Sequence, residues 1–518
     1  MLERRATTTF ACMSLDALSG GDDTNRRADH LGWRNRLRPR RGPHLPGVSQ
    51  AVGLLVADRQ ATADTIVAAP TPLQPIDLTD DARVAEVLDL AVRVGEVVLA
   101  SGTGVMDTTS QVRFIAATYG LARCDVDVTY DAIRIWADRG PLLPPASTMR
   151  IVQYRALDFT RLAAVDRLTR RIRTQVVAPE DARAALDAIT SAPHPYHRWT
   201  ATFGWSLLAA AIAALLGAGV VVAALSFATT AAIDRTNRVL NRYGLPFFFQ
   251  HMAGGLIAAT PAIVLSTLAE PLDIRVDPTL IIAAGITVLL SGLQLVGSVQ
   301  DAITGAPITA TARLLEVVMM TGGIVAGIAL ALRLGQVAGA TVPSIEMTSG
   351  RDITNLPVKI AAGAVAAMAF ALACYAERRA LAAAAFGGAA GAITYLLVQQ
   401  AGFGPVISSG VAATLIGLAG GLMARRALTP PLVVAVAGIT PLLPGLSVYR
   451  GLYAMLNDEP LLGFDQLLAA FGIGCALAAG VTLGEWCDRT LRRPPILSRF
   501  GALRRPIVRR RRRANPAH

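Results

Sequence analysis

The pattern of hydrophobic positions divides the chain into two parts. Residues 199–490 contain nearly all the long apolar runs, whereas residues 1–198 are rich in charge. A membrane-spanning helix needs about 20 apolar residues. The pattern therefore predicts a polytopic α-helical membrane protein with about ten spans, at roughly 202–217, 219–234, 246–268, 279–299, 314–333, 358–375, 380–399, 405–424, 431–449 and 466–487.

The segment before the spans shows two other periodicities. From Ala82 to Ala100 apolar side chains recur every three or four positions, which predicts an amphipathic helix, and Asp80 and Asp81 can cap its start. Cys124 to Tyr130 alternates strictly, as strands do. Residues 79–198 are thus expected to form a small cytoplasmic α+β domain, with further helices at 108–119, 159–176 and 180–189 and further strands at 132–136 and 149–154.

Two apolar runs are interrupted by residues that disfavour a helix. The run from Ile439 to Gly451 contains Pro441, Pro444 and Gly445, and a weaker copy lies at 287–298. Proline removes a backbone donor and clashes with the preceding turn. Two interrupted segments in corresponding positions of two halves indicate the binding site of a secondary transporter.

Each interruption falls in the fourth span of a half that has five. Because five is odd, homologous halves would lie in the membrane with opposite orientations. We therefore expect two inverted five-helix repeats, at 199–335 and 358–490, joined by an extracytoplasmic connector at 336–357.

Charge refines this picture. The chain is 53% hydrophobic and 17% charged, with a net charge of +12. The arginines concentrate in the tails and in alternate inter-helix loops, although the loop at 300–312 is nearly neutral, and this distribution places both termini in the cytoplasm. Residues 1–78 are expected to be a disordered basic tail and 491–518 a polybasic cytoplasmic tail, both suited to anionic lipid rather than to nucleic acid.

Motifs for other chemistry are missing from the sequence. It contains no Walker A sequence, so a gradient is expected to supply the energy. Its five cysteines form no CxxC and no Cys/His cluster, and no nucleophile–base pair is recognisable. We therefore expect no cofactor, no metal and no enzymatic activity.

Polar groups in or beside the spans are the candidate functional residues, because charge at membrane depth is costly and usually functional. The broken helices expose N–H and C=O groups that suit a zwitterion. The candidates for the substrate pathway are Ser291, Gly292, Gln294, Pro441, Pro444, Gly445, Ser447, Tyr449 and Arg450, and those for proton coupling are Asp301, Glu316 and His251. Asp301 and Glu316 could instead be solvated partners of Arg313 at the cytoplasmic interface, and His251 could be structural.

These residues resemble the threonine/serine exporter family of the ThrE type. The resemblance covers about residues 80–490, and it rests on Ser101–Thr103, Asp107, Tyr119–Leu121, Cys124–Thr129, Leu157–Asp158, Arg161–Leu162, Gly292–Leu293, Asp301, Gly305, Pro444–Gly445 and Tyr449–Gly451. It implies a hydrophilic N-terminal domain, ten spans, and export of L-threonine and L-serine driven by the proton motive force. The family usually has Pro-Gly in both halves, whereas this chain has Ser291-Gly292 in the first.

Two other functions stay open at this point. Some two-protein members of the family are associated with dicarboxylate export, for which Arg450 would have to supply positive charge. Residues 79–198 could also act as an enzyme or a sensor on a membrane anchor. The sequence also leaves open whether the chain forms a homo-oligomer. Our expectation is that the second half recognises the substrate carboxylate and the first half carries the proton.

Overall fold

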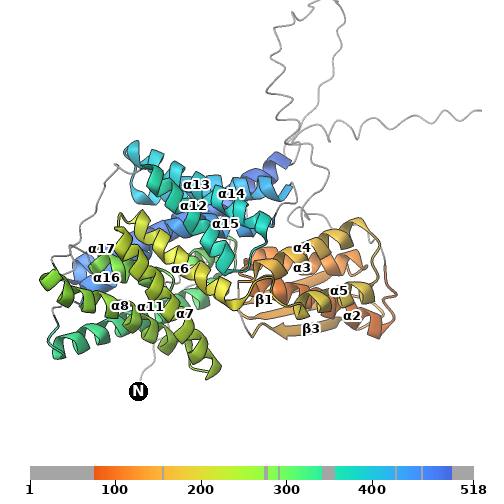
Figure 1. Ribbon diagram of the computed structural model, residues 1–518. Helices are drawn as coiled ribbons and strands as arrows, with labels where there is room; N and C mark the ends of the chain where they lie inside the picture. The colour runs from red at the N-terminus through yellow and green to blue at the C-terminus, as the bar shows by residue number, and fades with distance from the viewer. Residues whose placement is uncertain are drawn as a thin grey trace, which may run out of the picture. The chain divides into compact units, whose positions relative to one another are not determined.

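The computed structural model describes residues 75–153, 157–272, 278–289, 292–340, 356–425, 429–456 and 459–492 (Figure 1). Both basic tails and most of the connector between the halves lie outside the described residues, so the expectations for those segments stay predictions.

The first described part contains helices and a sheet, as the sequence predicted (Figure 1). Its elements are α2 (Asp81–Ala100), α3 (Val105–Thr118), β1 (Cys124–Thr129), β2 (Ala132–Ala137), β3 (Ala146–Ile151), α4 (Phe159–Thr174) and α5 (Pro179–Ser191). Asp80 caps α2, because its carboxylate accepts hydrogen bonds from the N–H groups of Ala82 and Arg83 at 2.9 and 3.2 Å. Gly102, with φ of +88°, lies in the turn that follows α2.

The three strands form an antiparallel sheet in the order β1-β2-β3. The third strand begins at Ala146 rather than at the predicted Met149, so that prediction was wrong at both ends. Ala146 pairs with Ala137 and Ile151 pairs with Ala132, so β3 is paired with β2 along the full length of both strands. Ala146, Ser147 and Thr148 lack a strong apolar alternation, and pairing with the neighbouring strand decides their conformation.

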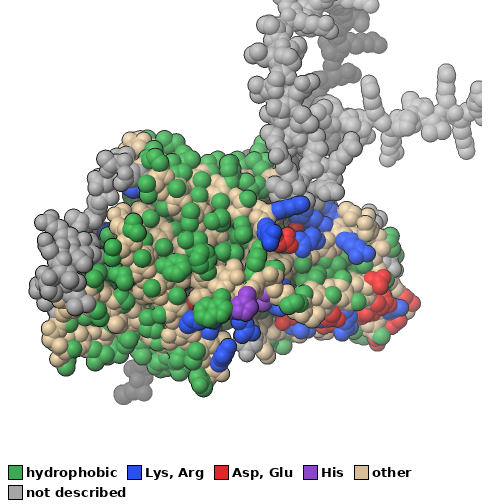
Figure 2. Space-filling view, viewed as in Figure 1, with side chains coloured by type: hydrophobic (Ala, Val, Ile, Leu, Met, Phe, Trp, Pro, Cys, Tyr) green, Lys and Arg blue, Asp and Glu red, His purple; other side chains and the backbone are tan. Residues whose placement is uncertain are grey.

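The rest of the described chain is helical. Its elements are α6 (Arg198–Leu215), α7 (Val220–Arg242), α8 (Phe247–Leu272), α9 (Pro278–Thr287), α10 (Gly292–Ile303), α11 (Pro307–Val337), α12 (Leu356–Ala373), α13 (Arg378–Gln400), α14 (Pro405–Arg425), α15 (Pro431–Ile439), the 3₁₀ turn η2 (Thr440–Leu442), α16 (Gly445–Leu456) and α17 (Pro460–Arg492). Six of the described helices, α8, α11, α12, α13, α14 and α17, are long and apolar enough to cross a membrane. Their exposed face in Figure 2 is largely hydrophobic. This supports a polytopic membrane protein, while the count of ten spans stays a prediction.

The helices after α5 form two series with similar lengths in the same order. From α6 to α11 they have 18, 23, 26, 10, 12 and 31 residues. From α12 to α17 they have 18, 23, 21, 9, 12 and 33. The pairings also correspond: α8 packs on α11 as α14 packs on α17, and α10 packs on α11 as α16 packs on α17.

Both predicted interruptions are present, and each divides a predicted span into two short helices. In the first half, α9 ends at Thr287 and α10 begins at Gly292. In the second half, α15 ends at Ile439 and α16 begins at Gly445 after the turn η2. Gly292 and Gly445 occupy corresponding positions in the two interrupted runs. Each of them therefore begins the second short helix of its half.

Glycines let the long helices approach closely. A Cβ added at Gly323 of α11 would lie 2.5 Å from the carbonyl oxygen of Phe248 in α8, and one at Gly417 of α14 would lie 2.7 Å from that of Val481 in α17. Small residues serve this purpose in membrane proteins, where helix association depends on close packing.

Two neighbouring glycines of α11 give a matched test of this packing. Gly323→Leu should lower the free energy of unfolding by about 1–3 kcal/mol through overpacking. Gly322→Leu should be tolerated, because nothing lies within 4 Å of a Cβ added there. Thermal unfolding of the full chain in detergent, followed by size-exclusion chromatography, measures the difference, and equal shifts for the two variants would contradict this account.

Candidate functional site

The two helix breaks lie against each other. A Cβ added at Gly292, the first residue of α10, would lie 3.2 Å from the Cβ of Leu443, which precedes α16. Leu293, Leu442 and Leu443 pack around the same cluster of buried side chains. The first N–H groups of a helix have no partner within it, and they carry a partial positive charge. The start of α10 therefore lies beside the loop that leads into α16.

A cavity of about 420 Å³ opens beside this contact. It is lined by α10 residues Leu293, Gln294 and Gly297, by Ala201, Trp205, Arg238, Arg313, Ala373, Cys374, Tyr375 and Val436 from other helices and turns, and by Ala100, Gly102 and Leu157 of the α+β domain. Its volume falls in the range of about 300–1,000 Å³ that is typical of small-molecule sites. Gln294 contributes a buried Oε1 atom that has no hydrogen-bond partner among the described residues.

Asp301 forms the first of two ion pairs at this cavity. Its carboxylate is fully buried and lies 2.6 Å from the guanidinium of Arg313, which lines the cavity. The other carboxylate oxygen accepts a hydrogen bond of 3.0 Å from the N–H of Val105, the first residue of α3. The residue before α3 is Gly104, which offers no capping side chain. Asp301 of α10 therefore caps a helix of the α+β domain.

Arg238 of α7 forms the second ion pair. Its Nε lies 2.8 Å from Oδ2 of Asp234, one turn earlier in the same helix, and that oxygen also accepts a hydrogen bond of 2.6 Å from the hydroxyl of Thr202. The Arg238 guanidinium also interacts electrostatically with the side chain of Tyr375. Both arginines that line the cavity thus have an aspartate partner. The positive charge of each wall arginine is therefore balanced by an aspartate. A ligand would meet two ion pairs, which act as fixed dipoles.

The sequence-predicted residues are only partly brought together. Gln294 lines the cavity and Gly292 lies at the contact of the breaks. In the second break, Pro441 is half-buried, and Pro444 and Gly445 are buried. Ser291 lies outside the described residues. Tyr449 belongs to α16, as do Ser447 and Arg450, which are half-buried and are not among the residues that line the cavity. The roles proposed for all of them stay predictions.

The three candidates for proton coupling have different surroundings. Asp301 does pair with Arg313, but full burial excludes the solvated alternative for its carboxylate. Glu316 accepts a hydrogen bond of 3.4 Å from the hydroxyl of Tyr130 in the α+β domain. The Nδ1 atom of His251 lies 2.8 Å from the carbonyl oxygen of Phe247 in its own helix. Asp301 thus pairs with a residue that lines the cavity.

Sequence reasoning missed Arg238, Tyr375 and the contribution of the α+β domain to the cavity walls. Arg238 was interpreted only as a signal of membrane orientation. Its aspartate partner four residues earlier, near the end of an apolar run, was the available sign of a functional pair. Tyr375 carries no local sign, because its φ of +59° and its contacts follow from the three-dimensional structure.

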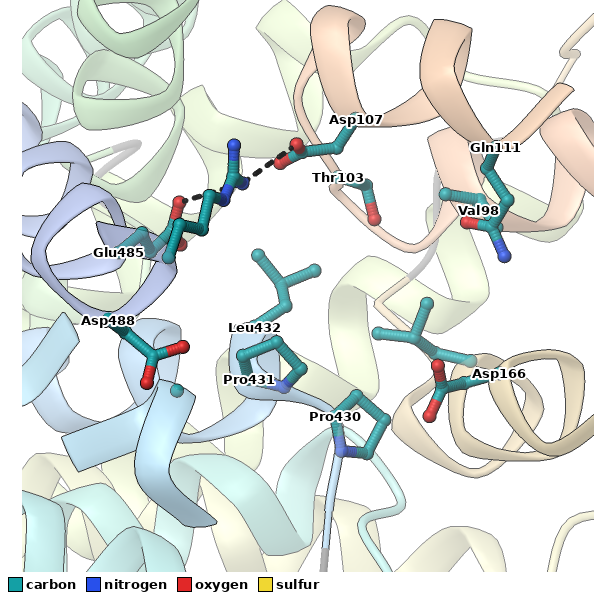
Figure 3. A pocket seen from close by; sticks show the side chains of 13 residues that line it. Val98, Thr103, Asp107, Gln111, Asp166, Pro430, Pro431, Leu432, Glu485 and Asp488 are labelled. Carbon is teal, nitrogen blue, oxygen red and sulfur yellow. Dashed lines mark hydrogen bonds and ion pairs between the residues drawn. The ribbon is translucent and has the colours of Figure 1, made fainter. Parts of the chain in front are cut away.

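A second, smaller cavity of about 60 Å³ lies between the α+β domain and α14, α15 and α17 (Figure 3). Arg489 of α17 lies 3.2 Å from Asp107 of α3 and 3.8 Å from Glu485 of its own helix. Burial raises the pKa of Asp166, which also lines this cavity, against the lowering effect of Arg170. The space suits water rather than an amino acid, so we regard this contact as a junction between domains.

The described residues contain no group of three or more side chains that could hold a metal ion. Comparisons with known proteins agree with a transport site instead. A family model described as "Putative threonine/serine exporter" matches residues 89–335, and one described as "Threonine/Serine exporter, ThrE" matches residues 359–486. The two matches divide the chain between α11 and α12, where the two helix series also divide.

Two similar proteins extend over most of the chain. The "Threonine/serine exporter" of Corynebacterium glutamicum is 44% identical over 448 residues, which cover 86% of this chain and 91% of that protein. The "Probable threonine/serine exporter" of Mycobacterium tuberculosis (strain H37Rv) is 39% identical over 419 residues, which cover 80% and 78% respectively. No solved structure matches the chain. These matches confirm the resemblance found in the sequence: the chain belongs to the threonine/serine exporter family, a family of transporters rather than enzymes.

Proposed function

We propose that the chain exports L-threonine and L-serine across the cytoplasmic membrane, with the α+β domain and both termini in the cytoplasm. The names of its two relatives support the substrates, and the apolar helices support the membrane. The arginine-rich tails, which lie outside the described residues, would contact anionic lipid.

The 420 Å³ cavity is the proposed substrate site, and its charge pattern carries the proposal. Threonine and serine are zwitterions at neutral pH, so a site with paired charges matches them better than a site with net positive charge. Arg238 would meet the substrate carboxylate. Because Arg238 belongs to α7 of the first half, this proposal differs from the expectation that the second half recognises the carboxylate. The buried Oε1 of Gln294 would accept a hydrogen bond from the ammonium or hydroxyl group. A dicarboxylate would bring two negative charges to walls whose arginines are already paired.

We further propose alternating access by two inverted repeats. If each broken helix counts as one span, each series has five spans and the chain has ten. The similar lengths and pairings support two homologous halves, and an odd number of spans would give them opposite orientations in the membrane. The contact between Gly292 and Leu443 would then place the two breaks near the membrane midplane, beside the substrate.

Asp301 is the proposed coupling residue. Its buried carboxylate interacts with two partners, the Arg313 guanidinium and the N-terminus of α3. Protonation of the Asp301 carboxylate would remove its negative charge, on which both the ion pair with Arg313 and the capping of α3 depend. It would therefore loosen a wall of the cavity and the contact with the α+β domain in a single step.

Substrate identity is tested by counterflow in proteoliposomes that contain the purified full chain and unlabelled threonine. Labelled threonine and serine should accumulate, and labelled succinate should not. Gln294→Leu should reduce threonine counterflow about tenfold or more, because a hydrogen bond to a charged group contributes about 1.5–3 kcal/mol. Gln300→Leu is the matched control on the same helix, away from the cavity. Accumulation of succinate in place of threonine would reject the proposed substrates in favour of the dicarboxylate alternative.

Coupling is tested with Asp301→Asn. The substitution removes the buried charge that pairs with Arg313, so the variant should be less stable than the wild type. Protein with a wild-type size-exclusion profile should retain threonine counterflow, which needs no net proton movement, but its net efflux should lose most of its dependence on an imposed pH gradient. The control Asp465→Asn removes an exposed carboxylate on α17 and should behave like the wild type. Unchanged gradient dependence in Asp301→Asn would assign the coupling to another group.

A further inference from the structure

The α+β domain contains a larger cavity, of about 800 Å³, that the proposed transport site does not include. Its walls come from the last turns of α2, from β3, from the start of α4 and from α5, and His194 and Tyr375 complete it. Tyr375 belongs to the turn between α12 and α13, so the helical part of the chain supplies one wall of this outer cavity.

The outer cavity and the 420 Å³ inner cavity share a wall. Ala100, Leu157 and Tyr375 line both of them. Ala100 is the last residue of α2 and therefore part of a regular helix, and Leu157 precedes α4. Tyr375 has the largest side chain of the three. Displacement of its ring would connect the two spaces directly.

Tyr375 is held from both sides. Its ring stacks on His194 with the ring centroids 4.4 Å apart and the planes at 17°, and its side chain interacts electrostatically with Arg238 of the inner cavity. The N–H of Phe159 donates a hydrogen bond of 3.0 Å to the carbonyl oxygen of Cys374, and the Thr160 hydroxyl donates to that of Tyr375. The start of α4 therefore fixes the turn that carries the ring.

The charged groups of the outer cavity are paired, as those of the inner cavity are. Arg150 lies 3.7 Å from Asp89 and also pairs with Glu96. Asp158 lies 3.4 Å from Arg161 and 3.1 Å from Nδ1 of His194. Arg93, also in the wall, pairs with Asp187. Walls of this kind offer a zwitterion weak dipolar contacts. A transport pathway requires contacts of this strength, because a tightly bound substrate would leave too slowly.

We propose that the outer cavity is the cytoplasmic section of the substrate pathway, and that Tyr375 is the gate between it and the substrate site. The proposal rests on the proposed export function and deepens it, because it makes the α+β domain part of the pathway. Gating would consist of moving the Tyr375 ring off His194. The contacts of α4 with residues 374 and 375 would couple that movement to the α+β domain.

Cys374 is a native reporter for the gate. Its side chain is 1% exposed and lines the inner cavity, directly beside Tyr375 in the sequence. A charged thiol reagent would reach it from the outer cavity only when the gate is open. The test uses the full chain in lipid nanodiscs, with Cys12, Cys124, Cys475 and Cys487 replaced by alanine and Cys374 retained.

The variants follow from the backbone of Tyr375. Its φ of +59° favours glycine and asparagine over other residues, so Tyr375→Asn removes the ring without adding backbone strain. Tyr375→Phe keeps the ring but removes the hydroxyl that interacts with Arg238, and it separates blockage by the ring from that interaction. Tyr375→Asn should raise the rate of Cys374 labelling about tenfold or more, as expected when a rarely open state becomes the main one. Tyr375→Phe should stay much closer to the wild type.

A second variant covers the case in which Tyr375→Asn is not monodisperse. Met149 lines the outer cavity with a side chain that is 54% exposed, so Met149→Trp should narrow the cavity and slow the labelling of Cys374. A labelling rate that neither variant changes, in protein with a wild-type size-exclusion profile, would overturn the gate.

The failure of this proposal is distinguishable from failure of the proposed function, because labelling does not require transport. If the protein shows threonine counterflow but neither variant changes the labelling of Cys374, the gate is rejected and the proposed export function stands. Faster labelling in Tyr375→Asn, with neither threonine counterflow nor protection of Cys374 by threonine, would support the gate and reject the proposed substrate.

Discussion

The rest of the site depends on the interactions of one buried group, the carboxylate of Asp301. It joins α10, Arg313 of α11 and the start of α3, which has no capping side chain of its own, and it has no exposure to solvent. Removal of one partner from a buried ion pair typically costs about 3–5 kcal/mol, because the other charge is left without compensation. The α+β domain is therefore attached at the point where the inner cavity is built. The rings of Phe159 and Phe370, 6.3 Å apart, and the bond between Tyr130 N–H and the Thr309 hydroxyl, 2.9 Å long, extend the same junction. Movement of the cavity walls would be transmitted directly to this domain.

The helix breaks depend on packing as well as on residues that disfavour a helix. The second break contains two prolines, whereas the described part of the first has only a glycine at the start of α10. The contact with Leu443 favours that glycine, because a Cβ at position 292 would lie only 3.2 Å from the Leu443 Cβ and would press on the neighbouring break. Backbone groups at membrane depth must be satisfied by protein or by water in a cavity. If the breaks lie at membrane depth, as proposed, the inner cavity beside them would fulfil this condition, and the interruption and the cavity would belong to the same structural feature.

Local patterns were sufficient to predict much of the fold. The amphipathic period located α2, strict alternation located β1, and prolines and glycines located both breaks. Asp301 was identified because a charge in an apolar run is costly. The misplacement of β3 and the missed roles of Arg238 and Tyr375 have a common cause, since each depends on segments distant in the sequence. The strand ends follow from pairing with β2, and Tyr375 becomes a wall only where the turn after α12 meets His194 and α7. A single sequence contains no local sign of such contacts between distant segments.

The sign of the proposed coupling limits which arginine can bind the substrate. Export driven by an inward proton gradient requires that substrate and proton occupy the protein alternately. If the substrate carboxylate bound Arg313, it would draw the guanidinium away from Asp301 and increase the affinity of that carboxylate for a proton. Substrate and proton would then bind together and move in the same direction, which is opposite to what export needs. Arg238 avoids this conflict because its partner is Asp234, so the substrate carboxylate could bind there while the ion pair between Arg313 and Asp301 stays intact. In the proposed mechanism the two ion pairs of the inner cavity would therefore have different tasks, substrate recognition on α7 and proton coupling between α10 and α11.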